Sequence, residues 1–281
     1  MKTISDTRPS PIVGQWYSSD ARNLSAQVDG YIDAAQLPKL SGDVVAIMAP
    51  HAGHRYSGPV AGFSFSALRG LNPEIVAVIS PMHQPYREPI LTTAHAAYET
   101  PLGSIPVDKE TIERLDVKLQ EKLGFGFTAV SNDTEHSLEI ELPFLQRALE
   151  EPFSLLPIML RDQSAMVAKT MGESLASVLA GRDAVLVAST DLSHFYPQHL
   201  AKVLDTEVLN KVASLDPQGV LDVEEQGKGF ACGRGALAAV LWAATDLGAN
   251  DAQIVNYATS GDITGDFSQV VGYGAAVITR S

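Results

Sequence analysis

The stretch VVAIMAPHAGH, residues 44–54, decides the expected fold class. Its first six residues are all apolar, and a short run of this kind is typical of a strand buried on both faces of a parallel sheet. His51 follows the run almost directly. Parallel sheets bind ligands beyond the carboxyl ends of their strands. The stretch therefore predicts a β-strand that delivers a histidine to a binding site.

Two later runs repeat this plan. IVAVISPMHQ delivers His83, and AVLVASTDLSH delivers Asp191 and His194. Because parallel strands end at the same edge of their sheet, we expect these side chains to meet His51 there. If only one strand ended in a histidine, a hydrogen bond from its ring to a loop carbonyl would explain it without any function. The repetition favours a functional site, and a metal site in particular.

The only cysteine, Cys232, lies in GFACGRGALAAVLWAATDL, where a glycine-rich turn precedes an Ala/Leu-rich helical segment. Buried free cysteine is a common small apolar residue of protein cores. A position before a helix N-terminus, beside Arg234, would instead lower the pKa of the thiol and favour the thiolate. The thiolate binds metals or attacks carbonyls. With His51 and His83, Cys232 would complete a His/His/Cys metal site.

Asp191 and His194 are three residues apart and share a face if their segment turns helically. Asp191 would then orient a histidine, and His194, whose unperturbed pKa is near neutrality, would move protons. The alternative is a capped turn with an exposed His194. His136 lies among glutamates in DTEHSLEIELPFLQRAL, which alone indicates a solvated acidic helix face. His95 and His199 have no supporting pattern, and we expect both at the surface.

The wider pattern of apolar runs and helical periodicity predicts an α/β fold of three layers, with a largely parallel or mixed central sheet. We expect a single domain over residues 1–281, because no linker interrupts the chain and a boundary would divide the site residues. The expected strands are 44–49, 74–80, 154–160, 184–189 and two near the C-terminus, and the expected helices are 20–37, one starting at Ser57, 108–123 and 164–179.

The acidic balance of the chain excludes some classes of partner. The net charge is −13, and no basic stretch resembles a phosphate-binding surface, so we expect no nucleic-acid partner. We also find no signal-peptide core and no apolar stretch long enough to cross a bilayer. These features predict a soluble, cytoplasmic protein. One cysteine makes no internal disulfide, which fits a reducing compartment.

Six motifs in order resemble the Memo family, also called the AmmeMemoRadiSam system protein B group. They are PHAGHRYSGPVAG, ETPLGSIPVD, EHSLEIELPFLQ, STDLSHF, ACGRGAL and TSGDITGDFSQVVGYGAAV, and the early VGQWYSSD is similar as well. The resemblance covers almost the whole chain. It implies an α/β fold similar to that of the class III extradiol ring-cleavage dioxygenases, which use non-haem Fe(II).

The resemblance also implies roles for individual residues. The family's metal ligands fall on His51, His83 and Cys232, while Asp191 and His194 neighbour that pocket. In the dioxygenases, histidines resembling His194 and His136 handle protons during ring cleavage, so these two and Asp191 are the expected catalytic residues. A thiolate in place of the dioxygenase carboxylate ligand shifts the metal preference toward copper, zinc or thiolate-ligated iron.

The chain departs from the family pattern at two positions. Most members have Ser-His-His after the second strand, where this chain has Met82-His83-Gln84. A tyrosine common in the first motif is here His54, which could add a pocket donor or a metal ligand.

Three functions remain open at this point. The first is a metal-dependent redox protein or dioxygenase-like enzyme that binds iron or copper, with zinc as the alternative metal, and acts on a small molecule. The second is a hydrolase in which Cys232 attacks a carbonyl, with His194 as base and Asp191 orienting it. The third is a non-catalytic protein whose vestigial pocket holds a peptide or partner. Family context implies radical-SAM and AMMECR-like proteins as pathway partners.

Overall fold

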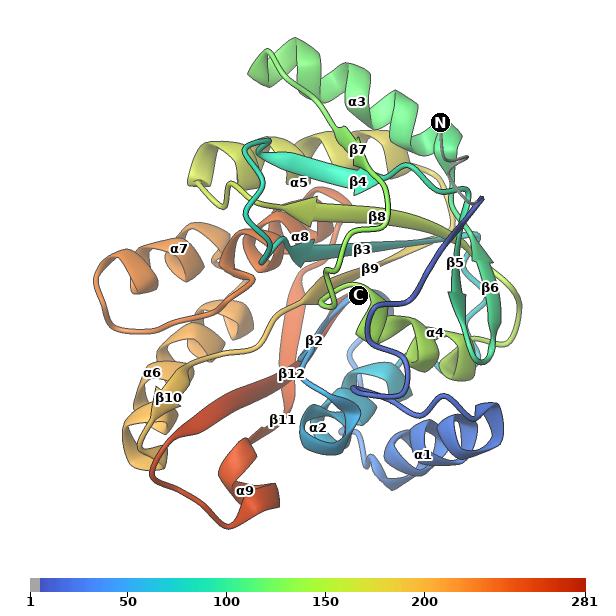
Figure 1. Cartoon of the computed structure of the whole chain (residues 1–281). Coiled ribbons are helices and arrows are strands. Elements are labelled where there is room, and N and C mark those ends of the chain that lie inside the picture. Colours follow the sequence, from blue (N-terminus) through green and yellow to red (C-terminus); the bar gives the residue numbers. More distant parts are fainter. Residues whose placement is uncertain (1–5) are drawn as a thin grey trace.

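The structure is a computed structural model that describes residues 6–281. Within this range, one large mixed sheet forms the centre of the molecule (Figure 1). Its strands are β2 (Asp43–Ala49), β3 (Ile75–Pro81), β4 (Ile90–Thr93), β7 (Thr128–Val130), β8 (Ser154–Leu160), β9 (Ala184–Ser189), β10 (His194–Tyr196), β11 (Asp251–Thr259) and β12 (Val270–Arg280).

The strand order is β10-β12-β2-β9-β3-β8-β4-β7, with β11 paired to β12. The pairs β2–β9, β9–β3, β3–β8 and β4–β7 are parallel. The pairs that involve β12, together with β4–β8, are antiparallel. The sheet is therefore mixed, with a parallel centre formed by the apolar runs that the sequence singles out. A separate small sheet contains β1 (Thr7–Arg8), β5 (Ala97–Thr100) and β6 (Gly103–Pro106).

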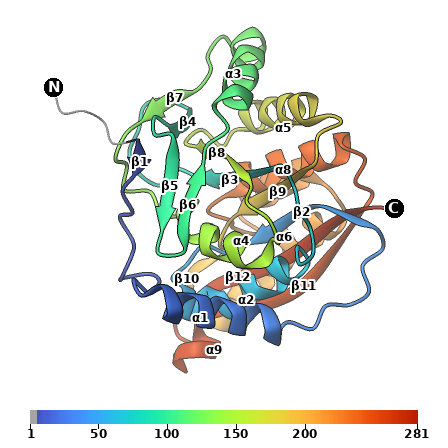
Figure 2. The same ribbon diagram turned by 90° about the vertical axis from the view of Figure 1, so that its right-hand side faces the viewer.

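Helices cover both faces of the central sheet (Figure 2). On one side α5 packs on α8, and α8 contacts β2, β3, β8 and β9; on the other, α1 packs on α2, which contacts β2 and β12. This confirms the three-layer α/β prediction. The helices are α1 (Ala21–Ala34), α2 (His54–Ser66), α3 (Lys109–Leu123), α4 (Leu142–Ala148), α5 (Ala165–Leu179), α6 (Gln198–Ala213), α7 (Pro217–Glu225), α8 (Arg234–Asp246) and α9 (Ser260–Thr264), and a 3₁₀ turn, η1, spans Glu139–Glu141.

Three predicted helix starts, at 20, 108 and 164, coincide with N-capping residues. Asp20, Asp108 and Ser164 each accept a hydrogen bond from the backbone N–H three residues later, at the starts of α1, α3 and α5. The prediction for α2 was wrong by three residues, because the helix begins at His54. Ser57 donates to the carbonyl of Ala52 instead of capping, and the ring of Pro59 lies inside the helix.

The three central parallel strands are almost entirely buried, since both of their faces lie under helices. One contiguous apolar core runs from Ile12 to Ile278. Among residues 6–281, no helix has both the length and the hydropathy needed to span a membrane.

Candidate metal centre

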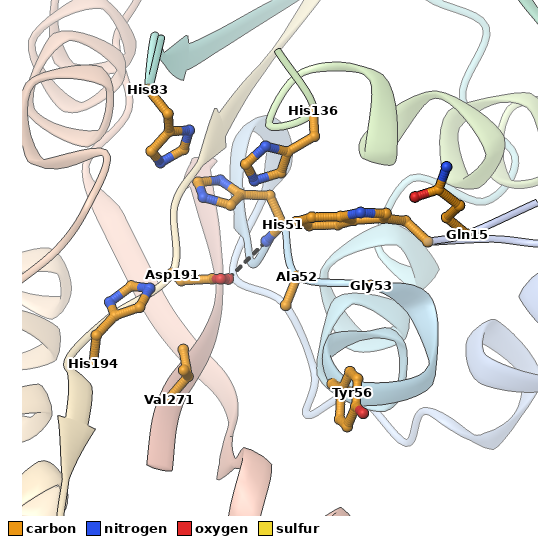
Figure 3. A pocket seen from close by; sticks show the side chains of 11 residues that line it. Gln15, His51, Ala52, Gly53, Tyr56, His83, His136, Asp191, His194 and Val271 are labelled. Carbon is orange, nitrogen blue, oxygen red and sulfur yellow. Dashed lines mark hydrogen bonds between the residues drawn. The ribbon is translucent and has the colours of Figure 1, made fainter. Parts of the chain in front are cut away.

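Neighbouring strands bring the predicted histidines to one edge of the sheet. β2 pairs with β9 in a register that places Ala49 beside Ser189, and β3 is the other neighbour of β9. The loops after these strands carry His51, Asp191 and His83 into one pocket (Figure 3). The ring centroids of His51 and His83 lie 5.3 Å apart. The expected meeting of these three strand ends is therefore confirmed.

His136 joins the two predicted histidines. Its ring is stacked on that of His83 at 4.8 Å and meets that of His51 edge-on at 5.5 Å, measured between centroids. One nitrogen from each of His51, His83 and His136 lies within 4.8 Å of the other two. Three imidazole nitrogens at this separation form a group that could hold a metal ion, and Figure 3 shows the three rings turned toward one another.

The acidic segment around His136 is not a solvated helix face, so that interpretation was wrong. His136 lies in a loop before η1, and the side chains of Glu135, Glu139 and Glu141 are 1%, 0% and 1% exposed. Each carboxyl group has buried partners from distant parts of the chain. The local charge pattern predicted exposed glutamates because their partners lie far away in sequence.

Glu135 fixes two of the three histidines. Its carboxylate accepts hydrogen bonds from the backbone N–H and Nδ1 of His83, at 2.5 and 2.9 Å, and from the backbone N–H of His136 at 2.8 Å. The Nδ1 of His136 lies 3.2 Å from the same carboxylate. Burial alone would raise the pKa of Glu135, but the hydrogen bonds from His83 and Ser137 and the two imidazoles hold it well below its usual range.

His51 has a different set of partners. Its Nδ1 lies 3.0 Å from the hydroxyl of Ser189, and its Nε2 lies 3.1 Å from the sulfur of Cys232. Burial, followed by the neighbouring His136 and His83, lowers the pKa of His51 well below its ordinary value. Burial likewise lowers the pKa of His136 to about 4. Both rings are therefore neutral near pH 7, which is the form that binds metals.

Asp191 holds the loop that carries His51. Its carboxylate accepts a 2.8 Å hydrogen bond from the backbone N–H of His51 and another from that of Ala52. Burial raises the pKa of Asp191 to about 7, against the lowering effect of these two bonds. Within the described residues, no hydrogen bond joins Asp191 to His194, and the segment between them is not helical. Asp191 therefore orients the His51 backbone and not the His194 ring.

The pocket has a volume of about 460 Å³, which suits a small molecule. Burial lowers the pKa of His194, which lies at its rim where β10 begins. Sequence reasoning missed Trp16, whose ring packs against that of His136 at an angle of 40°, with centroids 4.2 Å apart. The early VGQWYSSD similarity was its only signal. The pocket is lined by Gln15, Trp16, His51, Ala52, Gly53, Tyr56, His83, His136, Asp191, His194 and Val271.

Cys232 lies beside Nε2 of His51, at 3.1 Å, and outside the group of three histidines. It does not line the pocket, and its loop is held by Gln163, whose side chain donates to the Cys232 carbonyl. Burial and the Asp191 carboxylate raise the pKa of the thiol, so the predicted lowering was wrong. Arg234, which was expected to favour the thiolate, pairs with Glu224 at 2.6 Å.

The remaining histidines are structural or exposed. His54 is buried, and its Nε2 donates to the carbonyl of Ile140 at 3.0 Å, so it points away from the pocket and adds no ligand there. Gln84 does not line the pocket either. His95 was expected at the surface, but it is 1% exposed and accepts a hydrogen bond from the backbone of Asn132. His199 is exposed as expected.

Comparisons with known proteins agree with the motif resemblance. A family model described as Memo-like protein matches residues 8–277. The chain is similar to a MEMO1 family protein of Nitrosopumilus maritimus, 34% identical over 95% of this chain and 98% of the relative. A MEMO1 family protein of Methanopyrus kandleri is 33% identical over 97% and 99%. A solved structure of an uncharacterized protein from Escherichia coli K12 aligns at 15% identity with TM-score 0.48, covering 83% of this chain and 99% of that chain.

Proposed function

Since the chain belongs to the Memo-like family, we propose that it is a metal-dependent enzyme with redox chemistry of the dioxygenase type on a small molecule. The observation that carries this proposal is the convergence of His51, His83 and His136 in one pocket, with donor atoms within 4.8 Å of one another.

The donor set fits a metal because the far side of every ring is already engaged. The Nδ1 atoms of His83 and His136 face Glu135, and that of His51 faces Ser189. This leaves the Nε2 atoms of His83 and His136 for the ion, together with that of His51, which lies 3.1 Å from the sulfur of Cys232. Metal-binding histidines in proteins commonly direct their other nitrogen to a carboxylate or another oxygen, which fixes the tautomer and the ring orientation.

The ligand chemistry favours a transition metal. Imidazole nitrogens suit iron, copper and zinc, and the nearby sulfur of Cys232 would add a soft fourth donor beside His51. We propose His136 as the third ligand, with Cys232, which the family resemblance implies, as the competing candidate. A bound iron or copper ion would supply the electron-transfer chemistry that the pocket side chains lack.

The other pocket residues would handle the substrate and its protons. His194 reaches the rim of the pocket from β10 and is the group we propose for proton transfer, because a neutral imidazole accepts a proton near pH 7. The indole of Trp16 packs on His136 and forms an apolar wall. Asp191 keeps the backbone of His51 in place.

The alternative functions have weaker support. For a cysteine hydrolase, the thiol of Cys232 would need to reach the substrate, yet it does not line the pocket and its raised pKa disfavours the thiolate. A partner-binding protein would not need the ordered carboxylate behind His83 and His136. Association with radical-SAM and AMMECR-like proteins remains a prediction.

The test is metal analysis of untagged protein purified without oxygen, followed by reconstitution with iron or copper. We expect about one equivalent of metal in the wild type and its loss in His51→Ala and His83→Ala. His136→Ala and Cys232→Ala compare the two candidate third ligands, and His199→Ala, which changes an exposed histidine, is the matched control. A wild-type protein that takes up no metal under any of these conditions would contradict the proposal.

A further inference from the structure

The side chain of Glu141 is buried and has no role in the proposed function. It lies at the end of η1, is 1% exposed, and contacts the hydroxyl of Ser189 at 2.8 Å. No positively charged side chain is paired with it among the described residues. Buried polar groups in proteins are normally hydrogen-bonded, and the hydroxyl of Ser189 is the partner of this carboxyl group. The role of Glu141 therefore depends on the other contacts of that hydroxyl.

Ser189 stands between Glu141 and the metal pocket. Its Oγ has three neighbours: the carbonyl of Ser137 at 2.5 Å, a carboxyl oxygen of Glu141 at 2.8 Å, and Nδ1 of His51 at 3.0 Å. A serine hydroxyl has one proton to donate and two lone pairs that accept. The carbonyl of Ser137 can only accept. When the hydroxyl proton goes to this nearest oxygen, the other two neighbours must both donate.

The protons of the chain formed by Glu141, Ser189 and His51, called the relay below, follow from these contacts. Glu141 donates as a carboxylic acid, and His51 donates from Nδ1–H. We propose that Glu141, acting through Ser189, is a positioning residue that holds His51 in the Nδ1–H tautomer, which leaves the lone pair on Nε2. The sulfur 3.1 Å from Nε2 fits this assignment, because the thiol of Cys232 can donate to that lone pair.

The three histidines therefore have two kinds of hydrogen-bond partner at their Nδ1 atoms. An ionised Glu135 accepts from His83 and faces His136, whereas His51 is held by a neutral chain of Ser189 and Glu141. Burial raises the pKa of Glu141 well above its ordinary value, which agrees with the proton assigned to it. A neutral relay avoids a second buried negative charge next to Asp191.

The tautomer can be measured in metal-free protein by ¹⁵N NMR of labelled histidine, with His51→Gln to assign the signals. We expect a protonated Nδ1 and a bare Nε2 in the wild type and in Cys232→Ala. Ser189→Ala should lose the fixed tautomer, whereas Ser64→Ala should keep it. Ser64 is the matched control because its buried hydroxyl donates to the carbonyl of Met48 and touches no histidine. A wild-type signal with the proton on Nε2 would overturn the proposal.

The role of Glu141 is tested with two substitutions. Glutamine can donate an N–H to Ser189 as a carboxylic acid donates its O–H, so Glu141→Gln should keep both the tautomer and the wild-type Zn²⁺ affinity. Glu141→Leu and Ser189→Ala should lower that affinity about 10- to 100-fold. An infrared difference spectrum between the wild type and Glu141→Gln should show a protonated carboxyl band at neutral pH. If Glu141→Gln loses affinity like Glu141→Leu, or the band is missing, Glu141 is ionised and the proposal is wrong.

The predicted changes in Zn²⁺ affinity rest on the proposed function. The predicted tautomer of His51 does not depend on it. A wild-type protein that binds no Zn²⁺ would count against the metal proposal, while the NMR and infrared results would still decide the roles of Glu141 and Ser189. Should Glu141→Leu fail to fold, Ser189→Ala and Glu141→Gln provide the same comparison.

Discussion

His51 and His54 are three residues apart, yet their surroundings give them opposite roles. His51 lines the pocket, whereas His54 turns into the core, packs on Tyr17 and Phe144, and donates to the carbonyl of Ile140. Burial lowers the pKa of His54 to about 4. This histidine therefore bears on stability and not on metal binding.

His54 should make the stability of the protein depend on pH. In the unfolded chain its pKa is about 6.5, so between pH 6.5 and 4 the unfolded state binds the extra proton. The contribution of His54 to the free energy of unfolding should therefore be complete above about pH 6.5. The free energy of unfolding should fall by about 3 kcal/mol as the pH drops toward 4. His54→Phe should remove this part of the pH dependence, which urea unfolding at pH 7 and 4.5 would measure. Equal losses in both proteins would contradict it, and His199→Gln is the control.

Glu135 should contribute to metal affinity without touching the metal. Its carboxylate accepts from the backbone and ring of His83, and a glutamine amide can accept on one side only. We expect Glu135→Gln to weaken metal binding about 10- to 100-fold, as measured by competition with a chelator. Glu74→Gln is the control, because it removes a carboxylate that pairs with Arg182 away from the pocket. Unchanged affinity in Glu135→Gln would argue against its role.

At the scale of elements, α1 packs closely on α2, whose Tyr56 lines the pocket. A Cβ atom on Gly62 of α2 would lie 2.4 Å from the backbone oxygen of Tyr31 in α1, a separation that no side chain can occupy. Gly30 in α1 has open space around its Cα. The two helical glycines thus differ in packing and not in secondary structure.

This difference predicts opposite effects of the same substitution. Gly62→Ala should destabilise the protein by about 1–3 kcal/mol, because α1 and α2 must move apart. Gly30→Ala should stabilise it by about 0.5–1 kcal/mol, because alanine has the higher helix propensity. Thermal and urea unfolding of both variants would measure these changes, and destabilisation of equal size in the two would contradict the packing explanation.

At the scale of the whole molecule, Arg8 ties the N-terminal segment to the loop of His136. Its buried guanidinium pairs with Asp133 at 2.7 Å and with Glu139, and donates to the carbonyl of Glu135 at 2.7 Å. These partners lie more than 120 residues away along the chain. The network therefore holds the shape of the loop that carries Glu135 and His136.

Breaking this network should cost far more than breaking a surface ion pair. Arg8→Gln leaves buried carboxylates without their partner, and we expect a loss of about 3–5 kcal/mol in the free energy of unfolding. Arg69→Gln removes an exposed pair with Asp33 and should cost less than about 1 kcal/mol. Urea unfolding under identical conditions makes the comparison. Similar small losses in both variants would show that the buried network adds little.

Much of the fold was predictable from local sequence. Strands 154–160 and 184–189 were predicted at both ends, because their apolar residues are continuous and buried from both sides. β1, β4, β5, β6, β7 and β10 were missed; they have two to four residues each. Such short strands carry little periodic signal, and their pairing partners determine them.

The sequence by itself determined which strands deliver His51, His83 and Asp191 to one edge, because apolar runs and their endings are local features. Only the tertiary structure decided that His136 joins them and that Cys232 contacts His51 without lining the pocket. The local sequence around His136 predicts a solvated acidic face. In the structure its glutamates are buried, and Glu139 pairs with Arg8 while Glu141 contacts Ser189. The physical reason is that the burial and pairing of a charge depend on contacts distant in sequence, which no local pattern contains.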